Sequence, residues 1–370
     1  MLFSEVIGQE TVKQQLLAQL RTGHIPHAQL LYGPAGCGKL PLALAYATAL
    51  LCRQPVSGEA CGQCSGCRMT QKLEHPDLHF VFPIIENKKV SDNFLTKWRE
   101  LLRQSPYFDT KEWYSQLGVT TQQPRIYVSE SEELLRKISL SSSQGGYRVL
   151  IIWHPEHMMV QAANKLLKIL EEPQPGTAFL LVSDHPEMLL ETILSRCMRM
   201  ECKALTVAEV AAALVANYGL SQYDANVVAR SSGGSYTRAV AQVTAAGEEE
   251  LFLDMFKLLM RKGFSRQVRD LQAWSEQIAD WGREKQRRFL QYMHHVVRES
   301  FIRNLGQPAL NFTNTQEADF LTRFSPYINE RNVEGFAAEI DAAMRDIGQN
   351  ANAKIVFFDF ALQCLTLVRK

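Results

Sequence analysis

The spacing of apolar residues in the first half of the chain alternates between a strand-like and a helix-like pattern. Short, continuous apolar runs stand in AQLLY, YRVLIIW and TAFLLVS, and such runs are typical of parallel strands buried on both faces. Between them lie amphipathic segments such as QETVKQQLLAQLRTG, in which Val12, Leu16 and Leu20 share one helical face. This alternation predicts an α/β fold with a parallel sheet over residues 1–204.

The pattern changes after the sheet region. Three Ala-rich segments, TVAEVAAALVANYG, YDANVVARSSGGS and TRAVAQVTAAG, predict short helices that form a small helical domain, residues 205–248. Residues 249–370 have a helical pattern, with no two-residue alternation. We therefore predict a division into three domains. A polar, aromatic-rich stretch, residues 88–123, is interpreted as an insertion in the first domain, and its Trp98 and Trp113 suit either a partner surface or a local core.

Composition narrows the class of protein without identifying it. Hydrophobic residues make up 46% of the 370 positions and charged residues 21%, which indicates a soluble globular chain. The net charge is +1, so nucleic-acid binding would need a local basic surface. The basic helix expected at residues 283–303 is either such a surface or, as we favour, a solvated helix face. No apolar run is long enough to span a bilayer, so we expect a cytoplasmic protein without a membrane partner.

Four of the eight cysteines lie in one short segment, with the spacing C-x8-C-x2-C-x2-C: Cys52, Cys61, Cys64 and Cys67. Thiolates at this spacing can close a tetrahedral zinc site, and a site with four protein ligands is structural rather than catalytic. The glycines between them give the backbone the freedom that a tight metal-binding turn needs. Reduced, unliganded cysteines and a redox CxxC pair are the alternatives.

The segment GPAGCGKL resembles a phosphate-binding loop between an apolar strand and a helix. The positions that cradle nucleotide phosphates are occupied by Gly33, Gly36, Gly38 and Lys39. The next position, where a Ser or Thr hydroxyl binds magnesium in working sites, is Leu40. The loop is therefore interpreted as degenerate, with no magnesium site, and the sequence leaves open whether ATP or ADP still binds.

A second departure concerns the strand YRVLII. Hydrolysing P-loop enzymes hold magnesium with an acidic residue at the end of this strand, and a second one there commonly positions the attacking water. Here the next residues are Trp153 and His154, and the nearest carboxylate, Glu156, lies beyond a proline. Removing a single electrostatic stabiliser from other enzymes costs about 2.7–4 kcal/mol of transition-state stabilisation. We therefore expect no intrinsic ATPase activity.

Taken in chain order, HIPHAQLLYGPAGCGK, the cysteine cluster, AANKLLKILEEP and TILSRC resemble the clamp-loader subunits of bacterial DNA polymerase III, which are AAA+ proteins of DNA replication. The resemblance is strong up to residue 205 and covers the rest only in helical character. It implies a P-loop domain with a zinc module at residues 52–67, a helical lid and a C-terminal helical collar. Within that family the gamma/tau subunits hydrolyse ATP, and the delta-prime type, whose nucleotide site is degenerate, is the better match.

The resemblance also implies a role for the SRC motif. Ser195 and Arg196 match it, and the family's arginine projects as an arginine finger into the ATP site of a neighbouring gamma/tau subunit. A guanidinium is always charged, and its fork fits phosphate oxygens. The implied partners are the gamma/tau and delta subunits and, through the complex, the sliding clamp and primed DNA. The chain would then be a component of the DNA polymerase III holoenzyme.

Two alternatives stay open at this stage. One is a gamma/tau-type ATPase whose magnesium ligands are displaced, for example to Glu156. The other is a zinc-containing DNA-binding module that uses the basic helix. The sensor arginine of the ATPases is expected where Thr237 stands, and Arg238 lies one position late. This departure agrees with the delta-prime type.

Overall fold

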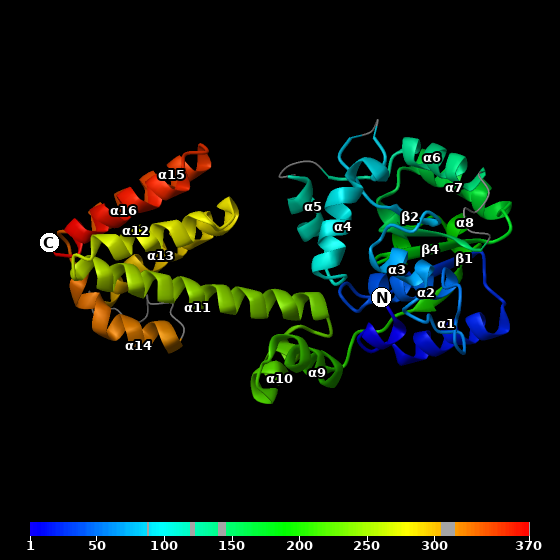
Figure 1. Cartoon of the computed structure of the whole chain (residues 1–370), viewed down its shortest axis with the longest axis horizontal. Helices are drawn as coiled ribbons and strands as arrows, with labels where there is room; N and C mark the ends of the chain where they lie inside the picture. The colour runs from blue at the N-terminus through cyan, green and yellow to red at the C-terminus, as the bar shows by residue number, and fades with distance from the viewer. Residues whose placement is uncertain (87–88, 119–122, 140–145, 305–314, 370) are drawn as a thin grey trace. The chain divides into compact units, whose positions relative to one another are not determined.

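The computed structural model of the chain (Figure 1) describes residues 1–86, 89–118, 123–139, 146–304 and 315–369. Its contacts separate two units, Met1–Gln242 and Val243–Lys370. Among the helices in the described ranges, none is both long enough and apolar enough to cross a membrane. Residue 88 and residues 119–122 of the predicted insertion lie outside the described residues.

A parallel sheet forms the centre of the first unit and confirms the predicted α/β class. In the described part of the chain it has five strands in the order β2-β3-β4-β1-β5, each parallel to its neighbours. Strands β3 and β4 are buried along their whole length, as the continuous apolar runs predicted. The strand bounds are β1 (Ala28–Tyr32), β2 (Leu78–Val81), β3 (Arg148–Trp153), β4 (Thr177–Ser183) and β5 (Met198–Glu201).

Helices precede and connect these strands. Those described in the first unit before its last helix are α1 (Glu10–Thr22), α2 (Lys39–Leu50), α3 (Ser65–Gln71), α4 (Leu95–Gln104), α5 (Thr110–Leu117), α6 (Val128–Ser139), α7 (Val160–Glu171), α8 (Glu191–Leu194), α9 (Val207–Tyr218) and α10 (Gln222–Ser231). Single 3-10 turns lie at η1 (Phe3–Glu5), η2 (Ser91–Phe94), η3 (Pro155–His157) and η4 (Pro186–Met188).

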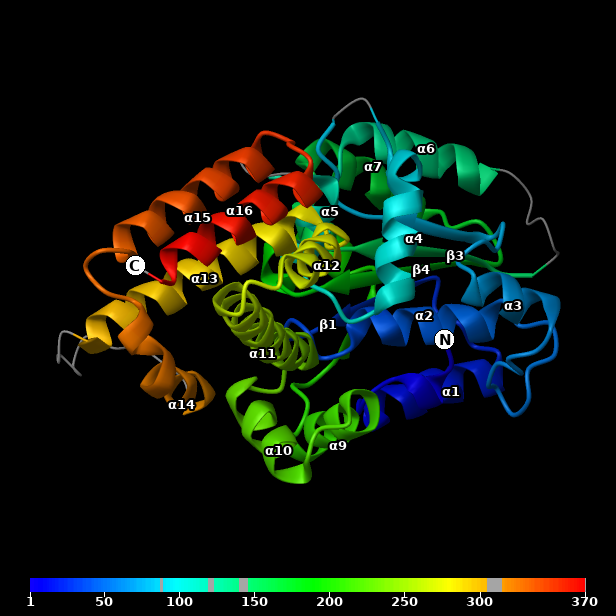
Figure 2. The ribbon, with the colours of Figure 1, turned by 60° about the vertical axis from the view of Figure 1, so that its left-hand side comes forward.

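Helices lie on both faces of the sheet (Figure 2), and apolar side chains form a layer beneath them on each face. On one face, alternate strand side chains such as Leu180 pack in a layer with α1, α2, α4 and α5. On the other face, the intervening strand side chains, such as Leu181, pack with α6, α7 and α8. Successive residues of a strand point to opposite faces, so both layers are built from the same apolar runs. This burial fixes the carboxyl end of β1, where the glycine-rich loop begins.

The predicted insertion packs into the first of these layers. Trp98 on α4 and Trp113 on α5 are fully buried, with ring centroids 5.2 Å apart. Trp98 also lies 5.3 Å from the ring of Phe108 and 5.1 Å from that of Trp153. The indole N–H of Trp113 donates to the Pro83 carbonyl at 2.8 Å. The two tryptophans therefore form a local core and not a partner surface.

The third short helix expected after the sheet is much longer than predicted. The segment TRAVAQVTAAG is only the first part of α11 (Tyr236–Phe264), which has 29 residues. The sequence that follows, GEEELFLDMFKLLMRK, contains no proline and many strong helix formers, so nothing local ends the helix. α11 continues across the boundary expected at residue 248, and the two units divide after Gln242. The three-domain division stays a prediction.

The second unit is helical in its described residues, as the sequence indicated. Its core contains fully buried aromatic side chains, among them Phe256, Trp274, Phe289 and Phe336. The neighbouring helices α15 and α16 are visible side by side in Figure 2. The bounds are α12 (Val268–Ala279), α13 (Arg283–Asn304), α14 (Thr315–Phe324), η6 (Ser325–Tyr327), α15 (Val333–Gly348) and α16 (Ala353–Leu367).

Replacing Trp98 by Ala should lower the free energy of unfolding by about 3–5 kcal/mol, because it removes a large, fully buried ring and leaves a cavity. Urea-induced unfolding followed by circular dichroism measures the change. Tyr223→Ala is the control, since this side chain is 78% exposed and its removal should cost less than about 0.5 kcal/mol. Similar losses for both variants would contradict the buried position of Trp98.

Candidate functional site

The glycine-rich loop joins the end of β1 to the start of α2 and keeps the backbone form of a phosphate-binding loop. Gly33, Gly36 and Gly38 all have positive φ values, of 146°, 76° and 101°. A Cβ atom on Gly33 would lie 1.9 Å from the Cys202 carbonyl oxygen, and one on Gly36 would lie 2.1 Å from the Ser235 hydroxyl. Glycine is therefore required at both positions for conformation and for space.

Lys39 points into the protein and is fully engaged there. Its ammonium group donates to the carbonyl oxygens of Gly33 at 2.7 Å and Pro34 at 2.5 Å. It also forms an ion pair with Asp184, at 2.8 Å from Nζ to Oδ1. The Lys39 side chain is only 3% exposed. The cation that would bind a nucleotide phosphate is thus paired with a carboxylate of the same chain.

The positions that hold magnesium in a working P-loop enzyme carry other side chains here. Leu40 and Trp153 are buried in the apolar layer. His154 is buried as well and adopts a left-handed backbone conformation, with φ 53°. None of these three side chains offers the carboxylate or hydroxyl oxygen that magnesium prefers.

Glu156, the displaced carboxylate, is turned inward. Its side chain is 1% exposed, and Oε1 lies 2.8 Å from Nδ1 of His154 and accepts the amide N–H of Asp184 at 3.0 Å. Burial acts to raise the pKa of Glu156, but the hydrogen bond and charge of His154 and the backbone amides outweigh it and lower the pKa to about 2. Glu156 therefore fixes Asp184 and does not line the cavity at the loop.

Two segments cover the loop from outside. The amide N–H of Tyr236, at the start of α11, donates to the Gly36 carbonyl at 2.9 Å. Tyr107, from the turn between α4 and α5, accepts the N–H of Ile7 at 2.8 Å, and its ring lies 4.9 Å from the ring of Tyr236. Thr237 lines the remaining cavity at the loop, which has a volume of about 30 Å³ and room for water.

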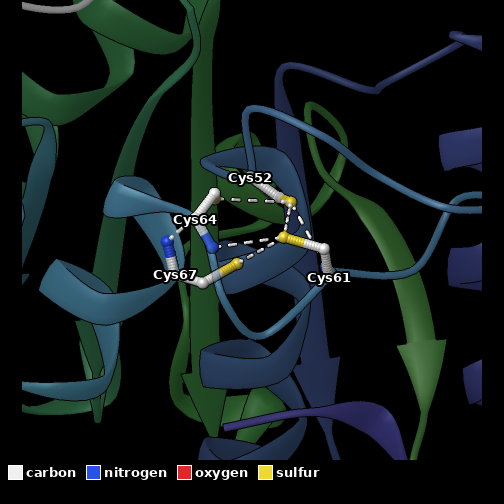
Figure 3. A group of neighbouring side chains, drawn as sticks. All are labelled: Cys52, Cys61, Cys64 and Cys67. Carbon is white, nitrogen blue, oxygen red and sulfur yellow. Dashed lines mark hydrogen bonds between the residues drawn. The ribbon is translucent and has the colours of Figure 1, made fainter.

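The four clustered cysteines lie at the other end of α2 (Figure 3). Cys52 follows that helix, Cys64 caps α3 and Cys67 lies in its first turn, and all four sulfur atoms lie within 4.8 Å of one another. α2 has twelve residues and spans about 18 Å, so the cluster is separate from the phosphate loop. Burial acts to raise the pKa of Cys64, but backbone amides and neighbouring thiols lower it to about 6.

The cluster geometry fits a tetrahedral metal ion. The sulfur–sulfur distances are 3.6 Å for Cys52–Cys61, and 3.9 Å for both Cys52–Cys64 and Cys61–Cys67. A zinc ion with Zn–S bonds of about 2.3 Å places its sulfur ligands about 3.8 Å apart. A Cβ atom on Gly66 would lie 2.3 Å from the Leu51 carbonyl oxygen, so glycine is needed for this close turn. The four cysteines could therefore hold zinc.

Arg196 lies after α8, where its side chain is 33% exposed. Its guanidinium donates to the Thr192 carbonyl at 2.8 Å and to the Glu171 carboxylate at 2.6 Å. The Ser195 hydroxyl donates to the same Thr192 carbonyl at 3.2 Å and so closes the end of α8. The pairing with Glu171 holds the guanidinium at the surface in one position.

Arg196 and the phosphate loop lie at opposite ends of the parallel strands, Arg196 at the amino ends and the loop at the carboxyl ends. β1 and β5 are parallel neighbours, with Gln29 beside Met198 and Tyr32 beside Glu201. The loop follows the carboxyl end of β1, whereas Arg196 precedes the amino end of β5. Four strand residues span about 13 Å. The structure therefore gathers the predicted loop residues at the carboxyl end of β1 and the four predicted cysteines at the other end of α2. It places Arg196 at the end of the sheet opposite the loop.

Sequence reasoning missed the residues that close the loop. Asp184 directly follows the buried strand β4, and an acidic residue at the carboxyl end of a parallel strand is a signal that could have identified it. Tyr107 gave no such signal, because its contacts are with residues distant in the chain. The expected sensor position, Thr237, faces the loop cavity, whereas the Arg238 side chain donates to the Ser232 carbonyl at 3.4 Å.

Comparison with known proteins matches residues 8–206 to the family described as "DNA polymerase III, delta subunit". The DNA polymerase III subunit delta' of Pseudomonas aeruginosa is 35% identical over 192 residues, which are 51% of this chain and 47% of that protein. The DNA polymerase III subunit tau of Escherichia coli is 29% identical over 208 residues, which are 56% and 26% of the two chains. The chain thus spans half or less of the length of these relatives.

Among solved structures, the Thermotoga maritima RuvB Holliday junction branch migration motor is 18% identical, with a TM-score of 0.41 over 69% of this chain and 66% of that one.

The purified chain should contain about one zinc ion, because four thiolates close the coordination sphere. Cys64→Ser should reduce the zinc content to less than half of that value, as measured by elemental analysis. Cys197→Ser, which changes a buried thiol outside the cluster, is the matched control and should keep the metal. A wild-type chain that stays metal-free after refolding with zinc would contradict the assignment.

Proposed function

This chain belongs to the DNA polymerase III delta subunit family, and from that premise we propose that it is a delta-prime-type, non-hydrolysing subunit of the bacterial clamp loader. In this proposal the chain docks beside a gamma/tau ATPase, and Arg196 enters the ATP site of that neighbour. The delta subunit is a further partner. Through the complex, the chain takes part in loading the sliding clamp onto primed DNA.

The position of Arg196 is the observation that carries this proposal. The guanidinium is held at the surface, at the amino ends of the strands, whereas the chain's own phosphate loop lies at their carboxyl ends. A phosphate that it contacts must therefore belong to another molecule. A guanidinium has a permanent charge and a planar fork of donors, so it can stabilise the charge that develops on a transferred phosphoryl group.

The chain's own loop supports the non-hydrolysing half of the proposal. Lys39 is engaged by Asp184, and the two positions expected to bind magnesium carry Leu40 and Trp153. Phosphoryl transfer in P-loop enzymes depends on the metal and on this lysine for charge neutralisation. A loop without either function can still serve as the turn that joins β1 to α2.

The two alternative functions have less support. A gamma/tau-type ATPase with a displaced ligand needs a carboxylate at the loop, but Glu156 is buried against His154. A DNA-binding module would have to use the cations of α13, some of which already have partners within the chain. There, Arg288 pairs with Glu248 at 2.8 Å, and Lys285 lies 4.9 Å from the ring centre of Trp281.

Zinc, in this proposal, is held by Cys52, Cys61, Cys64 and Cys67 and has a structural role. It would fix the turn between α2 and α3 in a segment where Cys61 and Cys64 are only half-buried. The cluster lies at the far end of α2 from the phosphate loop, so it takes no part in phosphate binding there.

Arg196→Ala should slow ATP hydrolysis at the adjoining gamma/tau site by a factor on the order of 10³, because an arginine finger contributes that much or more. The complex of this chain with gamma/tau and delta subunits is assembled with primed DNA and the sliding clamp. The rate of ATP hydrolysis is then measured in a single turnover, where the impaired gamma/tau site should appear as a separate slow phase. Arg196→Lys should restore little, since an ammonium lacks the fork of donors.

The matched control for this experiment is Arg199→Ala, which removes an exposed arginine of β5 three residues further along. It should leave both assembly and hydrolysis unchanged. Normal single-turnover rates in a fully assembled Arg196→Ala complex would refute the role of Arg196. Magnesium-dependent turnover by the isolated chain, lost in Lys39→Ala, would refute the non-hydrolysing assignment.

A further inference from the structure

Asp184 occupies an unusual place in this fold, beside the lysine of a phosphate-binding loop. We infer that its carboxylate takes the place of a phosphate group, so that the loop is closed from within against phosphate-bearing ligands. This inference deepens the proposed non-hydrolysing role and names the residue responsible. It concerns this chain's own loop and does not depend on Arg196.

The charge of Lys39 gives the first argument. The group is 3% exposed, and a buried ammonium needs both a counter-charge and hydrogen-bond acceptors. The carbonyls of Gly33 and Pro34 supply acceptors, and Asp184 supplies the charge. An incoming phosphate would have to displace Asp184 or approach it closely, and two anions at such distances repel strongly in a poorly solvated site.

Asp184 is also held firmly in this position. It follows the buried strand β4, and its amide N–H donates to Glu156 at 3.0 Å. Its second oxygen, Oδ2, lies 4.0 Å from Nε2 of His154. Because the carboxylate faces cationic or hydrogen-bonding partners on both sides, moving it away would leave the Lys39 charge unpaired. The carboxylate is therefore a fixed part of the loop.

The loop keeps the other features of an anion site. In the described parts of the chain, the backbone N–H groups of Gly38 and Lys39 donate to no protein acceptor. They stand at the start of the twelve-residue helix α2, where the helix dipole favours a negative charge. The hydroxyl of Thr237, which is 93% buried, lines the same cavity and also lacks a partner among the described residues. What opposes an external anion is thus chiefly the internal one.

Asp184→Asn should convert the closed loop into a site for phosphate groups. The amide keeps the shape of the carboxylate but leaves the charge of Lys39 unpaired. Inorganic pyrophosphate, titrated into the full chain by calorimetry without added magnesium, is the probe. We expect Asp184→Asn to bind pyrophosphate at least about tenfold more tightly than the wild type does, a gain of about 1.4 kcal/mol. That binding should weaken with salt and disappear in the Lys39→Ala, Asp184→Asn double variant.

Glu187→Gln is the matched control, because this nearby carboxylate pairs with His185 at the surface and should not affect pyrophosphate binding. Asp184→Ser is a second variant in case the amide does not fold. A folded Asp184 variant that binds no pyrophosphate would overturn the inference. Wild-type binding within about twofold of the variant, and lost in Lys39→Ala, would overturn it as well. Either outcome leaves the test of Arg196 in the assembled complex unaffected.

Discussion

The burial of one ammonium group constrains much of the first unit. The turn after β1 places Lys39 inside the protein, where a cation is unstable unless it is paired and hydrogen-bonded. Two loop carbonyls and Asp184 meet that requirement. Asp184 is held through its own amide by Glu156, and Glu156 in turn by His154. A single charge therefore ties together the carboxyl ends of β1, β3 and β4.

The apolar side of the same region follows from the side chain at the end of β3. A carboxylate there would need solvent or a metal ion, whereas the indole of Trp153 can be buried, and it packs on Trp98 and Phe108. The turn that carries Phe108 also carries Tyr107, which reaches across to Tyr236. The same residue, Trp153, thus replaces the acidic ligand and provides the surface on which the insertion packs.

Features that depend on neighbouring residues could be predicted from the sequence, and features that depend on distant ones could not. The apolar runs predicted β1, β3 and β4, and the cysteine spacing predicted four sulfurs that do lie within 4.8 Å of one another. Whether Trp98 faced a partner or a core stayed open, because its neighbours come from several segments. The pairing of Lys39 with Asp184 was missed for the same reason: only the sheet order brings β4 beside β1.

Because Arg196 is separated from the phosphate loop, the two ends of the sheet have different chemical properties. In the proposed complex, the end of the sheet at the start of β5 offers a guanidinium to a neighbour, while the end at the phosphate loop is filled by the protein's own carboxylate and aromatic rings. Subunits that associate head to tail repeat one contact along a row. A subunit that supplies an arginine to one neighbour, but has no nucleotide site to accept an arginine from the other, breaks this repetition. In the proposed complex, such a chain would stand at the end of the row, where it would limit the number of complete active sites.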